Sequence, residues 1–486
     1  MKIAVIGSGI GGLATACRLA AKGHEVTVFE KNASPGGKIA EIHESGYRFD
    51  TGPSLFTLPE LVEELYEAAG EPIPSTFAYK KLEVLCKYFY GSGERFVAWS
   101  DIQKFKEECA LQFGEDPARI TRYFKNAALI YKITADIFLF NSLHKVKNLL
   151  KFSVLKSFLQ IHKIRFYKTM HGDNRRYFKN PLLVQLFDRY ATYNGSNPYS
   201  APATLNVIAH LENNLGAFFP ENGMYSIIEH IYALAKKKGV SFKFNTLIDR
   251  IEIENNSVIG LTIENETLVF DRVVSNSDIN YVANNMMEHP QKKKINRLEP
   301  SSSALVFYWG IKKEFPDLDL HNILFSGDYK KEFNNLFKEK TIDNDPTVYI
   351  FVSSKVIESD APKDCENWFV MVNAPSNIGE NVDKMIHNAR QHIIQKINTY
   401  LNTDIEQYIE FEKIASPITI EKKTLSKGGA LYGNSSNGMF SAFLRHPNFL
   451  KDLRNLYFVG GSVHPGGGIP LCLSSAKIVA NEISSE

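Results

Sequence analysis

The sequence predicts an α/β fold in which a parallel-sheet domain is assembled from separate stretches of the chain and joined to an α+β domain and a helical part. Three patterns predict it. Apolar strands at 3–6 and 25–29 enclose a helix-compatible segment at 13–21, which makes a βαβ unit. Short strands follow one another from 240 to 274, and a buried-strand pattern with glycines comes near the end at 456–462. With 486 residues, two domains or more are expected. The pattern is mainly helical from 58 to 214 and is interrupted by a strand pattern at 84–99. An amphipathic helix is expected through Ile227, Ile228, Ile231 and Leu234, and a closing helix from about Ser474 to Ile483.

The turn after the first strand has a composition typical of dinucleotide binding. It reads Gly7-Ser8-Gly9-Ile10-Gly11-Gly12. Gly7 permits the tight turn, Gly9 lets backbone amides approach a pyrophosphate, and Gly12 lets the helix pack closely on the sheet. The phosphates would lie against the positive end of the helix. This Rossmann-like unit therefore favours a nucleotide cofactor.

Glu30 follows the second strand, where a carboxylate can accept hydrogen bonds from both ribose hydroxyls and would repel a 2′-phosphate. Pro35-Gly36-Gly37-Lys38 and the run 49–54 extend the cradle in the manner of flavin-binding proteins. A secretory signal is the rival interpretation, because Ala14-Thr15-Ala16 imitates a cleavage site. Four glycines break the apolar run, however, so we favour the cofactor site.

Composition narrows the class of protein. The chain is 44% hydrophobic and 23% charged, which is typical of a globular protein, and its net charge of +2 gives no argument for a nucleic-acid partner. The five cysteines have no Cys-x-x-Cys spacing, so neither disulfides nor a metal site are expected, and a reducing cytoplasm fits. The sequence contains no uninterrupted apolar run of about 18 residues, so a spanning helix is not expected.

The segment from Leu456 to Pro470, LYFVGGSVHPGGGIP, resembles the terminal signature of phytoene-desaturase-type carotenoid desaturases, which are FAD enzymes related to amine oxidases. The resemblance runs along the whole chain, through the opening glycines, the run 49–54, Asn222-Gly223-Met224 and Ser275-Asn276-Ser277-Asp278. It implies an FAD-binding fold of the amine-oxidase or glutathione-reductase type.

Two segments are similar to one branch of this family, which acts on hydroxylated acyclic carotenoid ends and includes the hydroxyneurosporene or 1-hydroxycarotenoid 3,4-desaturases. They are GGALYGNSSN at 428–437 and IPLCLSS at 469–475. There are two departures from the family pattern. Lys38 stands where Arg is usual, so a phosphate contact would lose its bidentate geometry, and Arg445-His446-Pro447 stands where an Arg-Pro pair is common.

The resemblance implies a discontinuous FAD-binding domain, a substrate-binding domain, and a helical region for substrate or membrane association. These are expected at 1–80, 215–290 and 418–486; at 81–99 and 291–417; and at 100–214. It also implies that Gly461 and Ser462 contact the phosphate or ribityl part of the cofactor, that 468–470 approach the isoalloxazine, and that Ile248 serves the adenine through its backbone. The expected cofactor-binding residues are Gly7, Ser8, Gly9, Ile10, Gly11, Gly12, Glu30, Lys31, Gly37, Lys38, Gly52, Pro53, Ser54, Leu55, Ile248, Asn276, Gly460, Gly461, Ser462, Gly468, Ile469 and Pro470.

The implied reaction is a 3,4-desaturation, in which a hydride passes to flavin N5 and a proton leaves the neighbouring carbon. The sequence identifies no catalytic base. His464 is interpreted as a residue that fixes its loop, and Glu221 and Asp188 as caps or surface ion pairs. Oxygen or a membrane quinone is the expected electron acceptor.

A basic, amphipathic pattern predicts how a lipophilic substrate arrives. Residues 137–172 contain seven Lys or Arg and no Asp or Glu. Apolar residues recur there at helical spacing, with lysines between them: Leu143, Val146, Leu150, Val154, Phe158 and Ile161, with Lys145, Lys151, Lys156 and Lys163. A helix packed on the core with a solvated basic face is the alternative. We favour an interfacial helix, and hence a protein attached peripherally to the inner face of the cell membrane.

Several functions share the predicted cofactor site. The leading one is a 1-hydroxycarotenoid desaturase, and phytoene desaturase is the nearest rival. A flavin amine oxidase and a non-catalytic carotenoid or flavin carrier are more distant.

Overall fold

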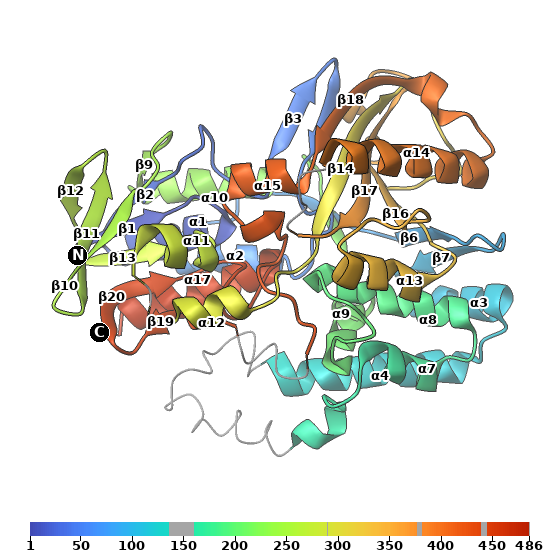
Figure 1. Cartoon of the computed structure of the whole chain (residues 1–486), viewed down its shortest axis with the longest axis horizontal. Helices are drawn as coiled ribbons and strands as arrows, with labels where there is room; N and C mark the ends of the chain where they lie inside the picture. Colours follow the sequence, from blue (N-terminus) through green and yellow to red (C-terminus); the bar gives the residue numbers. More distant parts are fainter. Residues whose placement is uncertain (136–159, 289, 377–381, 439–444, 486) are drawn as a thin grey trace.

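The computed structural model describes residues 1–135, 160–288, 290–376, 382–438 and 445–485 (Figure 1). The expected interfacial stripe from Leu143 to Phe158 lies outside the described residues. The domain boundaries given above stay a prediction.

The larger sheet is drawn from three separate parts of the chain. Its parallel core is β9–β2–β1–β13–β20, and β11, β10, β12 and β19 extend it (Figure 1). The bounds are β1 (Lys2–Ile6), β2 (Glu25–Phe29), β9 (Ser241–Lys243), β10 (Arg250–Glu254), β11 (Ser257–Ile263), β12 (Glu266–Val269), β13 (Arg272–Ser275), β19 (Phe449–Leu450) and β20 (Leu453–Phe458). The predicted discontinuous α/β fold is confirmed.

Helices cover this sheet. The buried helix α1 (Ile10–Ala21) packs against α17 (Ile469–Ile483) and α10 (Ser226–Lys237). α2 (Glu60–Ala68) packs against α1 and α17, and η6 (Val282–Met286) packs on β10 together with α11 (Ile279–Tyr281) and α12 (Lys292–Arg297). α15 (Pro417–Thr424) and η11 (Lys427–Gly429) contact the second sheet. The amphipathic pattern expected at Ile227, Ile228, Ile231 and Leu234 is confirmed by their burial in α10.

The closing helix begins at Ile469, five residues before the expected start at Ser474. Pro470 explains the difference, because proline fits the first turn of a helix, where its missing N–H has no intrahelical partner. The family motif Gly468-Ile469-Pro470 is therefore the start of α17.

The second sheet has the strand order β18–β14–β17–β16–β15–β6–β7, antiparallel except where β15 meets β6. Its strands are β6 (Val84–Phe89), β7 (Arg95–Trp99), β14 (Ser303–Ile311), β15 (His321–Leu324), β16 (Val348–Val352), β17 (Glu366–Ala374) and β18 (Ile409–Ala415). The strand pattern expected at 84–99 thus joins strands more than 200 residues later in the chain.

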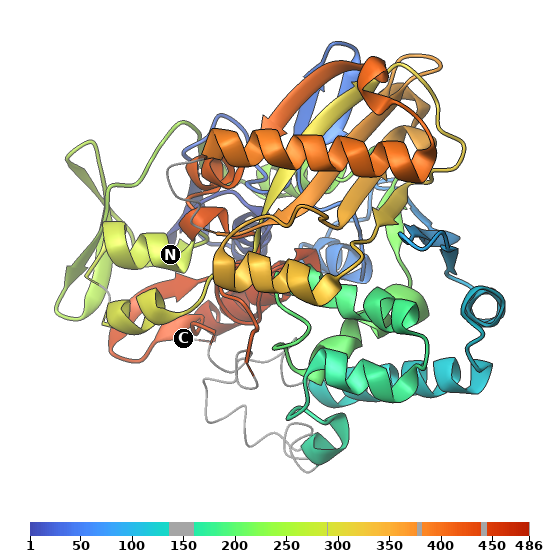
Figure 2. The ribbon, with the colours of Figure 1, turned by 45° about the vertical axis from the view of Figure 1, so that its right-hand side comes forward.

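Alternation along these strands separates two environments. Leu305, Phe307 and Trp309 of β14 pack in one apolar cluster with residues of α14 (Val382–Leu401), which lies across the sheet in Figure 2. Ala304, Val306 and Tyr308, which alternate with them along the strand, line a cavity on the opposite face. Because successive side chains of a strand point to opposite faces, one sheet supplies both a core and a cavity wall.

The helical part lies at the lower right of Figure 1. It comprises α3 (Ile102–Phe113), α4 (Pro117–Thr134), η2 (Ile161–Ile164), α7 (Met170–Tyr177), α8 (Pro181–Asp188), η3 (Arg189–Asn194), η4 (Ala203–Asn206), α9 (Val207–Ala209) and η5 (His210–Leu215). Asp101, Asp116, Thr169 and Asn180 cap the α3, α4, α7 and α8 starts through their side chains. In the described part of the chain, no helix combines the length and the apolarity that a membrane span requires.

The remaining elements are short. They are two ribbons, β3 (Glu41–Glu44) with β4 (Tyr47–Asp50) and β5 (Tyr79–Lys81) with β8 (Phe218–Pro220), and α13 (Tyr329–Asn334), η7 (Asn335–Glu339), η8 (Ser353–Lys355), η9 (Glu358–Asp360) and η10 (Ile405–Tyr408).

Candidate active site

A cavity of about 920 Å³ runs between the two sheets and into the helical part. All but two of the expected cofactor-binding residues line it. The exceptions are Ser8, which lies behind Glu30, and Gly12, where a Cβ would collide with the carbonyl oxygen of Gly7. Gly12 therefore serves close packing of the helix, as expected, and both residues support the cradle without lining it.

The glycine cradle closes around Asn276, at the end of β13. A Cβ added to Gly9 would lie 2.7 Å from Asn276 Nδ2, and one added to Gly460 would lie 2.5 Å from Asn276 Oδ1. Gly460 also has φ +96°, which L side chains rarely adopt. The first and last glycine motifs therefore meet at one amide side chain, and their bare backbone leaves the approach that a nucleotide needs.

Glu30 is buried beside this cradle and its carboxylate is fully engaged. Oε2 accepts hydrogen bonds from the amide and the hydroxyl of Ser8, at 2.8 and 2.9 Å. Oε1 accepts from the amide and Nδ2 of Asn32, at 2.9 and 2.7 Å. Glu30 thus lines the cavity where a ribose is expected, and it also ties the glycine turn to the chain that follows β2.

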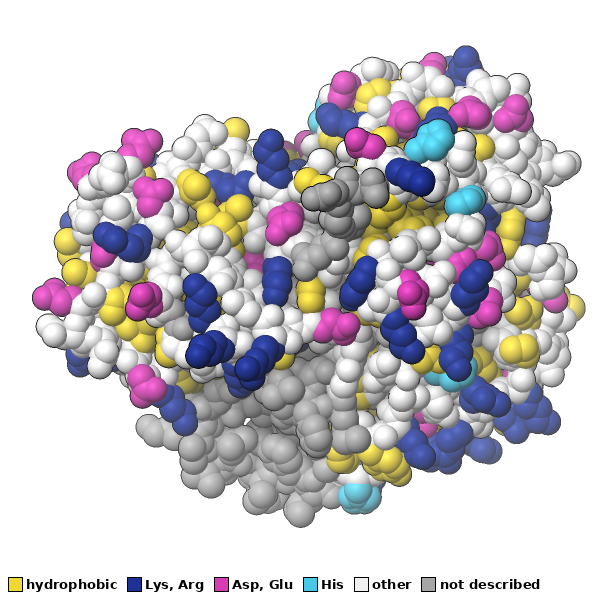
Figure 3. All heavy atoms as spheres, viewed as in Figure 1, with side chains coloured by type: hydrophobic (Ala, Val, Ile, Leu, Met, Phe, Trp, Pro, Cys, Tyr) yellow, Lys and Arg dark blue, Asp and Glu magenta, His cyan; other side chains and the backbone are white. Residues whose placement is uncertain are grey.

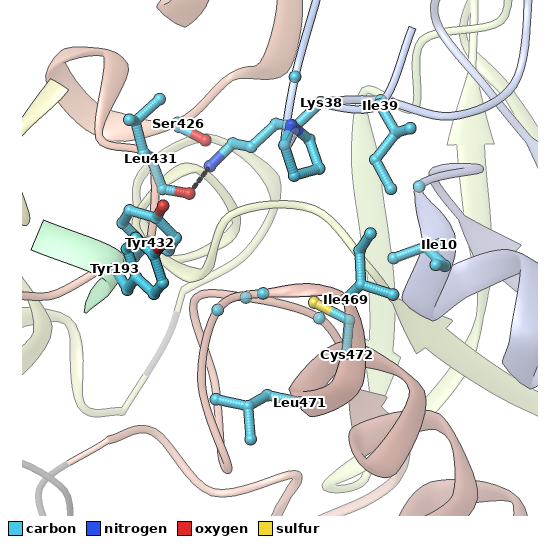
Figure 4. A pocket seen from close by; sticks show the side chains of 18 of the residues that line it. Ile10, Lys38, Ile39, Tyr193, Ser426, Leu431, Tyr432, Ile469, Leu471 and Cys472 are labelled. Atoms are coloured by element: carbon cyan, nitrogen blue, oxygen red, sulfur yellow. Dashed lines mark hydrogen bonds between the residues drawn. The ribbon is translucent and has the colours of Figure 1, made fainter. Parts of the chain in front are cut away.

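Lys38 crosses the cavity and does not present a free ammonium to a phosphate. Its Nζ donates to the carbonyl oxygens of Ala430 and Leu431, each at 2.8 Å, as Figure 4 shows for Leu431. Burial lowers the pKa of Lys38, and the charge of Asp278 acts in the opposite direction. Lys38 therefore ties the Gly36-Gly37 loop to the 428–437 segment, and its expected phosphate contact stays a prediction. Ile469 and Cys472 of α17 also line the cavity and lie next to each other, below Lys38 in Figure 4.

Arg445 is a second buried cation in the wall, and sequence reasoning noted it only as a departure from a family pattern. Its guanidinium donates to the carbonyl oxygens of Tyr432 and Gly461 at 3.2 and 3.3 Å, and to Asn194 Oδ1 at 3.0 Å. All three acceptors are neutral, and burial lowers the pKa of Arg445 to about 10. A fixed positive charge beside Gly461 favours negative charge on a group bound there.

The helical part contributes a polar cluster that the sequence did not reveal. Arg189 donates to Tyr88 Oη at 2.7 Å, Tyr193 Oη at 2.9 Å and Glu212 Oε1 at 3.3 Å. Tyr190 and Tyr193 donate to Glu212 as well, at 2.9 and 2.7 Å. The guanidinium lies 4.7 Å from the centroid of the Tyr190 ring. The members satisfy one another, as buried charged groups must.

His321 is the third buried group of the wall that sequence reasoning did not single out as functional. Its Nδ1 lies 2.8 Å from Tyr349 Oη, which lies 2.6 Å from Ser54 Oγ. Burial, with the positive charge of Arg189, lowers the pKa of His321 to about 3, so the imidazole is neutral.

The carboxylates considered from the sequence lie outside the cavity lining. Glu221 forms an exposed ion pair with Lys80 at 3.6 Å, as expected. Asp188 differs, because it is buried at the end of α8 and accepts from His171 at 2.6 Å and Asn174 at 2.8 Å. Burial raises the pKa of Asp188. The prediction of a cap or surface pair was therefore wrong for Asp188, since α8 carries it into the interior.

His464 is buried in its loop. Its amide donates to the carbonyl of His446 at 2.9 Å, and its carbonyl accepts from Asn448 Nδ2 at 2.8 Å and Ser475 Oγ at 3.0 Å. The loop-fixing interpretation agrees with these backbone contacts.

Comparison with known proteins assigns the family. The model of flavin-containing amine oxidoreductases matches residues 10–484. The chain belongs to this family. A flavin-containing amine oxidoreductase needs a flavin site, and the glycine cradle, whose bare backbone a Cβ would fill, fits one.

Similar proteins come from several sources. A 1-hydroxycarotenoid 3,4-desaturase of Flavobacterium sp. (strain P99-3) is 47% identical over 99% of both chains. A phytoene desaturase of Fusarium fujikuroi is 30% identical over 99% of this chain and 89% of its own. An oxidoreductase from Methanosarcina mazei has a similar solved structure, with a TM-score of 0.63 at 16% identity over 99% of this chain and 100% of its own. That structural likeness is one of fold.

Proposed function

We propose that this flavin-containing amine oxidoreductase is an FAD-dependent carotenoid desaturase. It introduces a C=C double bond at the 3,4 position of a 1-hydroxylated acyclic end. The observation that carries the proposal is the continuous cavity, which begins at the nucleotide cradle and continues along apolar walls into the helical part. The 47% identity to a desaturase of this kind supports it.

The cavity suits a long apolar chain. Ala304 and Val306 line it from the second sheet, and Leu205, Ile208 and Leu211 line it from the helical part. Such walls exclude water and hold the substrate by dispersion and the hydrophobic effect. Residues with a fixed backbone then orient the reacting carbons, and good orientation is worth up to about 7 to 11 kcal/mol of the barrier.

The cofactor residues keep the roles given from the sequence, with the changes that the contacts require. Bound FAD would accept the hydride. Gly9, Gly11 and Asn276 would hold its pyrophosphate, and Glu30 its adenosine ribose, displacing the Ser8 hydroxyl or the Asn32 amide. Arg445, which donates to the Gly461 carbonyl, would place a positive charge beside the bound cofactor. Lys38 would keep the 428–437 segment against the Gly36-Gly37 loop.

The far end of the cavity supports a membrane partner. Tyr131, Ile164 and Phe166 line it there. Close to them in sequence are exposed basic residues: Lys163, Lys168, Arg175, Arg176 and Lys179. Basic side chains gather over the helical part at the lower right of Figure 3. Basic groups close to an apolar part of the cavity lining suit an anionic bilayer surface, so we assign the protein to the inner face of the cell membrane as a peripheral protein.

The test of the function is anaerobic. FAD-loaded protein in liposomes is mixed with a 1-hydroxylated acyclic carotenoid or with phytoene, and flavin bleaching and the pigment spectrum are followed. Bleaching with a red-shifted pigment for the hydroxylated compound is expected. Bleaching with phytoene alone would assign phytoene desaturation, and no bleaching with either would indicate a carrier. Adding oxygen or a quinone to the bleached protein then identifies the electron acceptor.

The membrane assignment has its own test, which is sedimentation with vesicles. Reversing two charges, as Lys163→Glu with Lys168→Glu, should lower binding to anionic vesicles by at least about tenfold, since each basic residue near such a surface is worth about 1 kcal/mol. The matched control is Lys292→Glu with Lys293→Glu on the exposed basic run of α12. Equal losses in both pairs would contradict the assignment.

A further inference from the structure

His321 has a buried, unpaired nitrogen at the cavity wall. Within the described part of the chain, several buried side-chain nitrogen and oxygen atoms have no hydrogen-bond partner, and His321 Nε2 is one of them. Among the residues that carry those atoms, His321 is the one that lines the cavity. An unsatisfied buried polar atom costs about 1 to 3 kcal/mol, so its persistence at a binding surface points to a ligand atom that pairs with it.

Strand alternation aims the ring toward the cavity. His321 and Ile323 of β15 line the cavity, whereas Leu324 packs with the cluster under α14. Tyr349 of β16 also lines the cavity, and its neighbours Val348 and Ile350 face the other way. His321 and Tyr349 therefore share the cavity face of the sheet.

The ring is held on both sides. Nδ1 is paired with Tyr349 Oη at 2.8 Å, and the imidazole stacks on Phe351 with centroids 5.4 Å apart and planes at 20°. These contacts leave Nε2 as the ring nitrogen without a partner, on a residue that lines the cavity. Since Tyr349 also pairs with Ser54, the orientation of His321 is linked to the loop that follows Gly52 and Pro53.

The neighbouring polar groups are already satisfied. Arg189, Tyr193 and Glu212 line the same cavity and hydrogen-bond one another. Arg445 uses three carbonyl-type acceptors. A neutral imidazole beside Arg189 offers either a lone pair or an N–H, depending on its tautomer, and both suit a hydroxyl.

We propose that His321 Nε2 forms a hydrogen bond with the hydroxyl of the substrate's 1-hydroxylated end and so selects hydroxylated over non-hydroxylated carotenoids. This assignment rests on the proposed function. In such a substrate the hydroxyl-bearing carbon is two bonds from C3, so fixing the oxygen also fixes the bond to be desaturated. Entry of a non-hydroxylated end would leave Nε2 unpaired in an apolar site, and sites of this kind discriminate strongly against the analogue that lacks the group.

The test compares two substrates, a 1-hydroxylated carotenoid and the same compound with hydrogen in place of the hydroxyl. The rate of flavin bleaching and the apparent Kd are measured anaerobically at saturating FAD. The wild-type protein should favour the hydroxylated compound by at least about tenfold, the range of a lost buried hydrogen bond. His321→Phe should abolish this preference by slowing the hydroxylated substrate alone.

Two further variants separate recognition from structure. His321→Gln places an amide nitrogen near the position of Nε2 and should restore part of the preference. His321→Asn keeps an amide near Nδ1 and should not. Met371→Leu, an apolar change in the same wall, should affect both substrates alike.

The results of this comparison can overturn the assignment of His321 in three ways. If His321→Phe changes both substrates by the same factor while FAD content and unfolding are normal, the residue is structural and the assignment is overturned. If the wild-type protein reacts with both compounds equally, the assignment is also overturned, although desaturation stands. If the wild-type protein reacts with neither, the proposed function falls and the assignment falls with it.

Discussion

Glu30 and Ser8, 22 residues apart in the chain, are joined by two hydrogen bonds to a single carboxylate oxygen. The second oxygen takes two more from Asn32. The carboxylate that a ribose is expected to meet therefore also holds the glycine turn in place. Cofactor binding and local stability are coupled at this residue.

Replacing this carboxylate tests the coupling. Glu30→Gln keeps the shape but turns one acceptor into a donor that faces donors. Hydrogen bonds to charged groups contribute about 1.5 to 3 kcal/mol, so FAD affinity should fall by at least about tenfold, with a lower free energy of unfolding. Titration of apoprotein with FAD, followed by flavin fluorescence, measures the first, and urea unfolding the second. The control is Glu25→Gln, at the exposed start of β2, the strand that Glu30 follows; it should change neither.

Gly460 offers a test with a matched partner. Gly460 and Gly93 have similar backbone angles, φ +96° and +101°, but a Cβ meets Asn276 at 2.5 Å in the first and nothing within 4 Å in the second. Alanine should therefore strain both backbones by about 1 to 3 kcal/mol. Gly460→Ala alone should also push Asn276 into the cradle and reduce FAD content as purified. Similar FAD content in the two variants would refute a role for this close approach.

The parts of the site that could be predicted from the sequence are those that depend on local spacing. The glycine turn, Glu30 and the 456–470 motif depend on spacing within short segments, where strand, turn and helix follow in order. The two glycine motifs converge at Asn276 once β1, β13 and β20 are neighbours in a parallel sheet, because the carboxyl ends of such strands meet at one edge.

Pairing between distant segments explains which site residues could not be predicted from the sequence. His321 reaches the wall because β15 pairs with β6, which comes more than 200 residues earlier. Lys38 meets the carbonyls of Ala430 and Leu431, which come 392 and 393 residues later in the chain. A lone histidine or lysine carries no local signal of such a partner. The start of α17, in contrast, could have been predicted from Pro470.

Arg445 should tune the flavin through its charge. Arg445→Met removes a buried cation beside Gly461, so the flavin should be harder to reduce. We expect a midpoint potential at least about 30 mV more negative, which is about 1.4 kcal/mol for a two-electron couple. Arg445→Lys should recover part of the shift, and Arg95→Met, which removes an exposed Arg paired with Asp317, should cause none. An unchanged potential in Arg445→Met would show that its charge does not reach the flavin.

The neutral state of His321 predicts a pH dependence of stability. Its pKa is lowered from 6.5 to about 3 by burial and by Arg189. Below pH 6.5 the unfolded chain binds a proton that the folded protein does not, so this residue destabilises the fold as the pH falls toward the folded pKa. Each pH unit in that range is worth about 1.4 kcal/mol, which makes about 2 kcal/mol between pH 6.5 and pH 5. His321→Phe should therefore lose about 2 kcal/mol less than the wild-type protein over that interval in urea unfolding, because every other titrating group contributes equally to both proteins. Equal losses would mean that His321 is protonated in the folded state, and the neutral hydrogen-bonding imidazole would then be wrong.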